Sequence, residues 1–307
     1  MQSTAAPALW LRLRRRWLNE QTALGYLFIL PIIVAFSLYT IYPMVDAFFI
    51  SLTSWNGYAP VKEFVAARNY VRLARDPVFW GVLKTTAYYT ASHLPLTMGA
   101  GLILALLVNQ KLRGRAFFRT LYYTPSITPT IAASIVWIFI LNGDWGVLNW
   151  LLSLFRIHGP NWLKDPSWAL PAVVLFGMWK GSGYHMVVLL AGLQTIPESL
   201  YEAARIDGAG RLALFRHVTW PLLSPTTFFL FIQTIISSFQ VFNSIYVMTQ
   251  GGPLKATTVM VYLIYQSAFE NFEMGYACAL AYALFAVIFV LTIIQFRTVG
   301  RRVHYEY

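Results

Sequence analysis

The sequence has too little charge for a soluble protein of its length. Only 11% of its 307 residues are Asp, Glu, Lys or Arg, whereas soluble domains carry roughly 25%. So few solvated side chains cannot cover the surface of a folded chain, so lipid must cover much of it. The Lys and Arg residues also lie beside apolar segments and form no single patch, which argues against nucleic-acid binding.

Residues that carry catalysis and metal binding are scarce as well. Cys278 is the only cysteine, so an intrachain disulfide is excluded. The five histidines include no pair at i, i+4, and the sequence has no CxxC, HExxH, GxxxxGK[ST] or GxSxG motif. These absences predict a chain with no catalytic residue, no metal site and no cofactor of its own.

Apolar residues are abundant, at 58% of the chain, and they gather in long runs. Each run is long enough to cross a bilayer, which needs about 20 residues, and must be helical because lipid offers the backbone no hydrogen-bond partners. We therefore expect an all-α integral membrane protein with six transmembrane helices. The predicted spans are 24–50, 82–108, 122–141, 169–192, 225–248 and 277–297.

The first run follows four arginines, as in a signal peptide. It is too long for a signal h-region, and no A-x-A cleavage site follows it. We interpret it as a retained first helix.

The positive charges predict the orientation. One set of alternating loops and tails holds seven basic residues and the other holds fourteen. Because basic loops stay in the cytoplasm, both termini are expected there, in a multi-pass protein of the cell membrane. The opposite orientation is the less favoured alternative. The larger set comprises Arg12, Arg14, Arg15, Arg16, Lys111, Arg113, Arg115, Arg119, Arg205, Arg211, Arg216, Arg297, Arg301 and Arg302.

Two of the opposite loops have amphipathic segments. Ala67–Ala74 predicts a short helix, and residues 142–168 are rich in tryptophan. Both are expected to lie at the outer membrane surface.

The loop at 195–225 is predicted to form two short helices. Thr195 and Glu198 have the spacing of a capping box, and Asp207-Gly208 is typical of a helix end. A second helix is expected from Gly210 to Val218, before Pro221 and Pro225 mark the return to the membrane.

Within this loop Ala203 and Ala204 are small enough for another surface to approach closely. Glu202 offers a carboxylate for a charge-assisted contact with an Arg or Lys of a partner. The residues leave two interpretations open, a hairpin lying on the membrane and a docking element.

Lys180 is the charged side chain that we place near a bilayer midplane, in the segment Trp179–Tyr184. A charge there costs several kcal/mol unless it faces a cavity or a partner. A cavity role, snorkelling and a salt bridge to a partner subunit all remain open. His185 is interpreted as a packed polar residue.

The order of these features resembles the binding-protein-dependent ABC permease family, type I, in its carbohydrate branch, which includes maltose and glycerol-3-phosphate permeases. The resemblance extends over about 24–297. It rests on short motifs at characteristic places: Ala67-Arg68-Asn69-Tyr70, Phe118-Arg119-Thr120, Gly146-Val147-Leu148-Asn149, Gly192-Leu193-Gln194-Thr195-Ile196-Pro197, Glu202-Ala203-Ala204, Asp207-Gly208-Ala209, Met248-Thr249-Gln250-Gly251-Gly252-Pro253 and Gly275-Tyr276-Ala277.

The resemblance implies a transport subunit that works with a second, similar permease, two cytoplasmic ATPase subunits and an extracytoplasmic solute-binding protein. ATP and Mg²⁺ would bind the ATPases, and a sugar or related polyol would be imported. It implies a cytoplasmic tail at 1–23, a first helix at 24–50 and a permease domain at 82–296. Coupling to the ATPases is then expected of Glu202, Ala203, Ala204, Asp207 and Gly208.

Candidate residues of the solute pathway also follow from the resemblance. Gly181, Tyr184, Ser238 and Val241 match sugar-contact positions of the maltose permease. Ser238 and Val241 stand where that permease has asparagines, which puts maltose itself in doubt. Trp179 can stack on a sugar ring and Gln240 can bond hydroxyls. Interhelical hydrogen bonding of Ser238 and Gln240, and interfacial anchoring by Trp179, are the structural alternatives.

The competing function class is a secondary transporter driven by an ion gradient. Such proteins use acidic residues inside the membrane, whereas the acidic residues here fall near span ends or in loops. The sequence therefore favours an energy source outside the chain.

Overall fold

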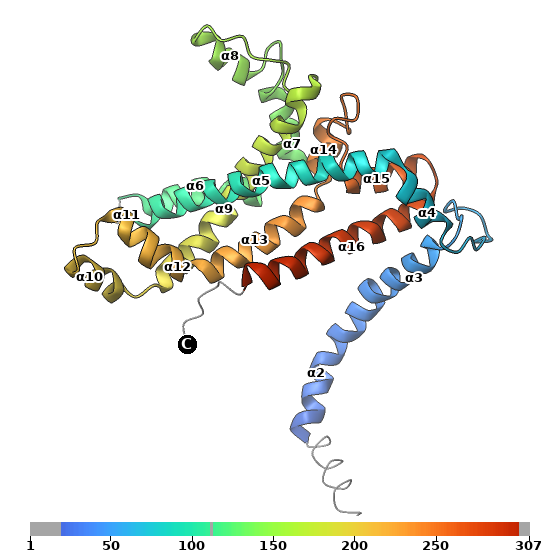
Figure 1. Cartoon of the computed structure of the whole chain (residues 1–307), viewed down its shortest axis with the longest axis horizontal. Coiled ribbons are helices and arrows are strands. Elements are labelled where there is room, and N and C mark those ends of the chain that lie inside the picture. Colours follow the sequence, from blue (N-terminus) through green and yellow to red (C-terminus); the bar gives the residue numbers. More distant parts are fainter. Residues whose placement is uncertain (1–19, 111–112, 301–307) are drawn as a thin grey trace, which may run out of the picture.

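The computed structural model describes residues 20–110 and 113–300. The tail at 1–19 and the basic residues Lys111, Arg301 and Arg302 used in the orientation argument lie outside the described residues. Within them the fold is helical, with an isolated bridge between Thr53 and Phe64. The long helices α5, α9, α13 and α16 form a bundle (Figure 1). The all-α prediction is confirmed.

Among the described residues, four helices are long and apolar enough to cross a membrane, and the count reaches the predicted six only if each of two bent helix pairs is one span. The four are Leu24–Ser51, Pro77–Asn109 (α5), Pro166–Thr195 (α9) and Met274–Thr298 (α16).

Two of the long helices begin at the same signal, which we overlooked in the sequence. Asp76 and Asp165 accept hydrogen bonds from the backbone N–H groups of Val78 and Ser167, two residues further on. A proline follows each aspartate at the first helical position, where its fixed φ suits the helix. Consequently α5 and α9 begin before the predicted 82 and 169.

The first span is an arm that leaves the bundle (Figure 1). It consists of α2 (Glu20–Phe36), a π-helical turn η1 (Ser37–Ile41) and α3 (Tyr42–Ser51). Its contact with the bundle is made by α3 against α16, where the Tyr282 hydroxyl donates to the Met44 carbonyl. The apolar side chains of α2 have no cover within the described chain.

The predicted third span, 122–141, is not one straight helix. It divides into α6 (Arg115–Ile127) and α7 (Thr130–Ile140), which meet at 99°. The physical cause is Pro129, which has no N–H and holds Thr128 in an extended conformation.

The fifth span, predicted at 225–248, is also interrupted. It begins as α12 (Trp220–Leu222) and α13 (Ser224–Phe239), and α14 (Asn243–Met248) follows a break at Gln240–Phe242. The pair Arg211–Leu222 and Ser224–Phe239 is bent by 65°.

Short helices lie in the connections between the long ones. The predicted helix near Ala67–Ala74 is α4 (Arg68–Arg75), and the tryptophan-rich segment contains α8 (Val147–Leu154), far from the bundle (Figure 1). Helix α15 (Met260–Tyr265) and the π-helical turn η3 (Gln266–Glu270) were not predicted.

An ion pair joins α4 to the residue that precedes α16. Arg72 donates to both carboxylate oxygens of Glu273 at 2.9 Å, and this contact raises the pKa of Arg72. Two parallel bonds of this kind fix geometry as well as charge.

Helix α5 contributes buried residues to each of three hydrophobic clusters in the described chain. Glycines allow the close approach of α5 and α9. A Cβ on Gly101 would lie 2.4 Å from the Cβ of His185, and a Cβ on Gly177 would lie 2.8 Å from the Tyr89 hydroxyl. The two helices therefore pack almost backbone to backbone.

Candidate functional site

Residues 195–225, which we call the interspan loop, form two short helices as predicted, with one correction at their start. Helix α10 spans Glu198–Ile206, and α11 (Arg211–Leu214) continues into the π-helical turn η2 (Phe215–Thr219). Thr195 does not cap α10, because it is the last residue of α9 and its hydroxyl donates to the Gly192 carbonyl. Pro197 ends α9 instead, by keeping Ile196 extended.

The turn between the two helices is a Schellman motif, in which a left-handed residue after the helix lets two N–H groups bond back to it. The N–H of Ala209 bonds the carbonyl of Ala204 at 2.9 Å, and that of Gly208 bonds the carbonyl of Arg205 at 3.0 Å. Gly208 has a φ of +83°, a conformation that glycine adopts freely. Asp207-Gly208 therefore fixes the angle at which α10 leaves the loop.

One side of the interspan loop holds it to the bundle. The hydroxyl of Tyr201 lies 3.1 Å from that of Thr219, and the Tyr201 ring packs with Val218 and Leu222 on the buried cluster of α5 and α9. These contacts attach α10 to the end of the bundle.

The other side has no partner within the described chain. Ile206 and Leu212 are 86% and 80% exposed. Glu202 and Asp207 are exposed, and their carboxylates form no hydrogen bond or ion pair with residues 20–110 or 113–300. Ala203 is exposed beside them. Apolar and acidic side chains are thus exposed together on α10, the turn after it and α11, and we call these residues the open face of the interspan loop.

Lys180 lies at the bend between α6 and α7. Its ammonium donates to the carbonyls of Pro125 at 3.1 Å and Thr128 at 2.6 Å. The Pro125 carbonyl has no helical donor, because the residue four positions on is Pro129 and lacks an N–H. Lys180 therefore places a positive charge on the unpaired carbonyl end of α6, where a cation is favourable.

Ser126 strengthens the same contact. Its hydroxyl donates to the Lys180 carbonyl at 2.8 Å and accepts from the Tyr184 N–H at 3.0 Å, so it sits between two groups of α9. Gly183 makes room, since a Cβ there would lie 2.2 Å from the Tyr122 carbonyl oxygen. We call this set the α6–α9 junction: Tyr122, Pro125, Ser126, Thr128, Lys180, Gly183 and Tyr184.

The remaining pathway candidates do not form one cluster. Trp179 is 37% exposed and stacks at a tilt on Trp137. Gly181 lies against Thr97 of α5, since a Cβ added to this glycine would be 2.9 Å from a Thr97 methyl carbon. Gln240 is exposed at the end of α13, and Val241 packs against the cluster around Phe176.

Ser238 is buried and forms a hydrogen bond to another helix, as its alternative interpretation, interhelical hydrogen bonding, predicts. Its hydroxyl lies 3.0 Å from His93 Nδ1, and the neighbouring pair His185 Nε2 and Thr234 Oγ1 lies 2.7 Å apart. These contacts join α13 to α5 and α9.

The polar stripe of α5 that includes His93 was not predicted. Thr86, Thr90, His93 and Thr97 recur at i, i+4, i+7 and i+11 along α5 and are all buried. That helical spacing was visible in the sequence and predicts a single buried face. Over the described residues, no three His, Cys, Asp or Glu side chains gather as metal ligands do.

Comparison with known proteins identifies the family. Residues 97–304 match the model of the "Binding-protein-dependent transport system inner membrane component" family. The chain is 36% identical over 282 residues to the trehalose/maltose transport system permease of Thermococcus litoralis, covering 92% of this chain and 95% of that protein.

Other relatives transport different solutes. The chain is 34% identical to the sn-glycerol-3-phosphate permease of Agrobacterium fabrum, with 92% of this chain and 96% of that protein covered. It is 34% identical to the lactose permease of Rhizobium radiobacter, with 91% and 94% covered.

The fold agrees with this assignment. A bacterial ABC transporter involved in import of the acidic polysaccharide alginate matches with a TM-score of 0.80 at 24% identity, over 96% of this chain and 99% of that chain. The prediction of a transport subunit rather than an enzyme or a gradient-driven carrier is confirmed by the relatives. The chain belongs to the binding-protein-dependent ABC permease family and is a multi-pass inner-membrane transport subunit.

Proposed function

We propose that this permease carries a sugar or related polyol, delivered by an extracytoplasmic binding protein, into the cell at the expense of ATP. The support for the solute class comes from relatives whose names specify trehalose/maltose, lactose and glycerol 3-phosphate. Support for a binding protein comes from a similar fold, TM-score 0.81, solved as an ABC transporter in complex with an alginate pentasaccharide-bound periplasmic protein.

The observation that carries the energy coupling is the open face of the interspan loop. Ile206 and Leu212 offer apolar anchors, while Glu202 and Asp207 hold carboxylates that are unpaired in the described chain. A cytoplasmic ATPase with a matching apolar socket edged by Arg or Lys fits this face. ATP and Mg²⁺ then bind the two ATPase subunits, and Glu202, Ala203, Ala204, Asp207 and Gly208 transmit their closure.

The arm formed by α2, η1 and α3 supports the proposal that a second permease subunit binds this chain. Within its most apolar window of 18 residues, none is buried against the bundle. Phe28 and Tyr39 are 77% and 78% exposed. Lipid alone can cover such a helix, but the apolar length that leaves the bundle also offers a surface for another six-span subunit.

The proposed orientation places the interspan loop and both termini in the cytoplasm. The permease domain is proposed to extend over 82–296, after the tail at 1–23 and the first helix at 24–50. On this proposal the solute passes the part of α9 that holds Trp179, Gly181 and Tyr184, with Gln240 and Val241, which follow α13, near the outer end. Lys180 and Ser238 act there by holding helices together.

A mild-detergent pull-down from the native membrane tests the proposal. Mass spectrometry is expected to find a Walker-motif ATPase, a second permease and a solute-binding protein. Isolation of the chain alone, with transport in liposomes that needs no ATP, contradicts it.

A further inference from the structure

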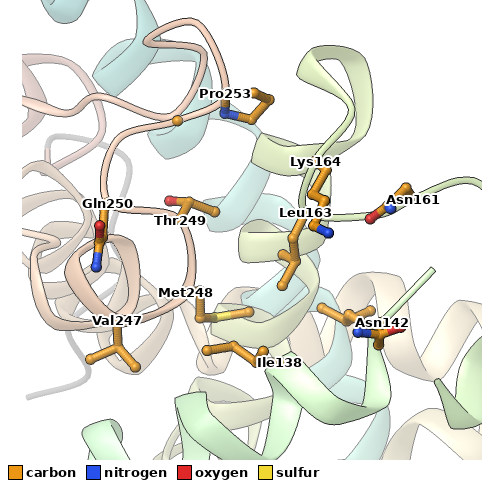
Figure 2. A pocket seen from close by; sticks show the side chains of 12 residues that line it. Ile138, Asn142, Asn161, Leu163, Lys164, Val247, Met248, Thr249, Gln250 and Pro253 are labelled. Atoms are coloured by element: carbon orange, nitrogen blue, oxygen red, sulfur yellow. The ribbon is translucent and has the colours of Figure 1, made fainter. Parts of the chain in front are cut away.

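An open pocket of about 420 Å³ lies where α7 ends, beside α14 (Figure 2). One wall is formed by Ile138, Leu141 and Asn142 at the end of α7 and by Asn161, Leu163 and Lys164 before α9. The opposite wall is α14 and the loop after it, from Val247 to Pro253. Because α13 runs from the interspan loop to α14, this pocket lies at the far end of α13 from that loop.

Apart from the Thr249 hydroxyl, which bonds the Ile245 carbonyl and the Thr257 hydroxyl, the polar side chains of the pocket have hydrogen-bonding groups that the described chain leaves free. The side chains of Asn161, Lys164 and Gln250 form no hydrogen bond with any part of the chain that the structure describes. Asn142 uses only Oδ1, which accepts from the N–H groups of Asp144 and Trp145, so its NH₂ group remains available. The lining also includes the Thr249 hydroxyl and contains no carboxylate.

Hydrogen bonds hold the wall after α14 in place. The Thr257 hydroxyl lies 2.6 Å from the Gly252 carbonyl and 2.8 Å from the Thr249 hydroxyl. The Thr258 hydroxyl donates to the Gly251 carbonyl at 3.0 Å. These threonines fix the loop that carries Gln250, so the pocket does not depend on a partner for its shape.

The wall before α9 is held in a similar way. Asn149 donates to the Gly143 carbonyl at 2.7 Å and accepts from the Trp162 indole at 2.7 Å. The absence of a side chain at Gly143 allows Asn161 to lie close to its backbone, since a Cβ added to Gly143 would be 2.7 Å from the Asn161 Cγ. Both walls are therefore preorganised, which reduces the cost of binding.

We propose that this α7–α14 pocket binds one end of a saccharide at the outer face of the membrane, with preference for an acidic sugar residue such as a uronate. Carboxamides bond sugar hydroxyls as donors and acceptors, while the half-buried side chains of Ile138, Leu163 and Val247 offer an apolar surface to the C–H groups of the ring. No carboxylate of the protein lines the pocket to neutralise the ammonium of Lys164, so this side chain favours a ligand that carries a carboxylate. The outer placement rests on the proposed function.

The test uses the chain co-purified with its ATPase and placed in lipid nanodiscs. The probes are digalacturonate and its neutral counterpart galactobiose, with binding followed by saturation-transfer NMR. Digalacturonate is expected to bind about tenfold more tightly than galactobiose, because one charge-assisted hydrogen bond to Lys164 contributes an affinity gain of about this size. Lys164→Met is expected to abolish that difference, and Asn161→Ala to weaken both probes several-fold.

The matched control is Lys255→Met, which removes an exposed lysine of the same region that does not line the pocket. It is expected to leave both affinities unchanged. Equal binding of the two probes by the unaltered chain, or an unchanged preference in Lys164→Met, overturns the proposal.

Two further outcomes separate this inference from the proposed function. Loss of a co-purifying binding protein in Lys164→Met, with no saccharide binding in the unaltered chain, identifies the pocket as a protein contact and overturns the proposal. Failure to recover any ATPase contradicts the proposed function instead, whereas an ATP-hydrolysing assembly that binds neither probe contradicts only this inference.

Discussion

The interspan loop and the α6–α9 junction both hold charged groups, but these groups differ in whether they have a hydrogen-bond partner within the described chain. At the junction Lys180 bonds two carbonyls of its own chain, and Ser126 uses its hydroxyl both as donor and as acceptor. In the loop, Glu202 and Asp207 have no partner in the described chain, and Ile206 is 86% exposed. A charged group that is hydrogen-bonded within its own chain supports the fold. An unpaired charge beside an exposed apolar residue is suited to binding a partner protein.

The largest effect is expected from Gly183→Ala, which breaks the junction. Its added Cβ would lie 2.2 Å from the Tyr122 carbonyl oxygen, a backbone atom that cannot move without shifting α6. Overpacking of this kind costs roughly 1–3 kcal/mol, and backbone contact puts this case at the upper end. Thermal unfolding in detergent measures the cost.

Gly99→Ala on α5 is the matched control. No atom lies within 4 Å of the added Cβ, and alanine favours a helix over glycine by about 1 kcal/mol. Its melting temperature is expected to be unchanged or raised. Equal losses in the two variants would mean that the approach of α6 to α9 is not what limits stability.

Ile206→Asp tests the open face of the loop. Apolar anchors at the centre of an interface contribute about 2 kcal/mol or more, so retention of the ATPase is expected to weaken by roughly thirtyfold or more. Glu202→Ala is expected to act in the same direction. The melting temperature of the isolated chain is expected to stay unchanged, because neither side chain supports the bundle.

The control for that pair is Leu254→Asp, which changes a side chain that is 90% exposed in the loop after α14. It is expected to retain the ATPase fully. Normal retention and coupled ATP hydrolysis in both loop variants would remove the docking role from α10.

Lys180→Met is expected to have an intermediate effect that distinguishes support from docking. It leaves the carbonyls of Pro125 and Thr128 without their donor, which costs about 1–3 kcal/mol. Unfolding temperature and uptake are both expected to fall, while the ATPase still co-purifies. Lys84→Met, which alters an exposed lysine of α5, is the comparison. Unaltered melting in Lys180→Met would show that the junction does not need the ammonium.

The same two regions show what the sequence can predict. The turn at Asp207-Gly208 was predictable because its cause is local, a residue that must adopt positive φ. The bend of the third span was not, although Pro129 was visible. A proline inside a span is compatible with a kink or a near right angle, and here Lys180 and Ser126, more than 50 residues apart in the chain, bond across the bend. Long-range partners of that kind leave no local signal.

The candidate site residues also divide into those whose setting has a local cause in the sequence and those whose setting depends on long-range contacts. Glu202 and Asp207 were predictable as exposed charges because their place in a polar loop needs no tertiary information, and their contact with another protein stays a prediction. Ser238 was assigned to the pathway by resemblance, and its bond to His93 depends on how α13 crosses α5. The capping box at Thr195 failed because α9 continues to that residue, and only the helix length decides which helix Thr195 belongs to.

The smallest expected effect separates backbone conformation from contact within the loop. Gly208 and Gly210 both have open space around an added Cβ, but Gly208 has a φ of +83° and Gly210 has a φ of −74°. Gly208→Ala therefore costs about 1 kcal/mol through strain alone, and Gly210→Ala costs nothing of that kind. If the Schellman turn sets the angle at which α10 meets the ATPase, Gly208→Ala lowers ATPase retention a few-fold while Gly210→Ala leaves it unchanged. Equal retention in the two variants would mean that the open face tolerates a range of loop angles, and that the interspan loop differs from the α6–α9 junction in rigidity as well as in its unpaired charges.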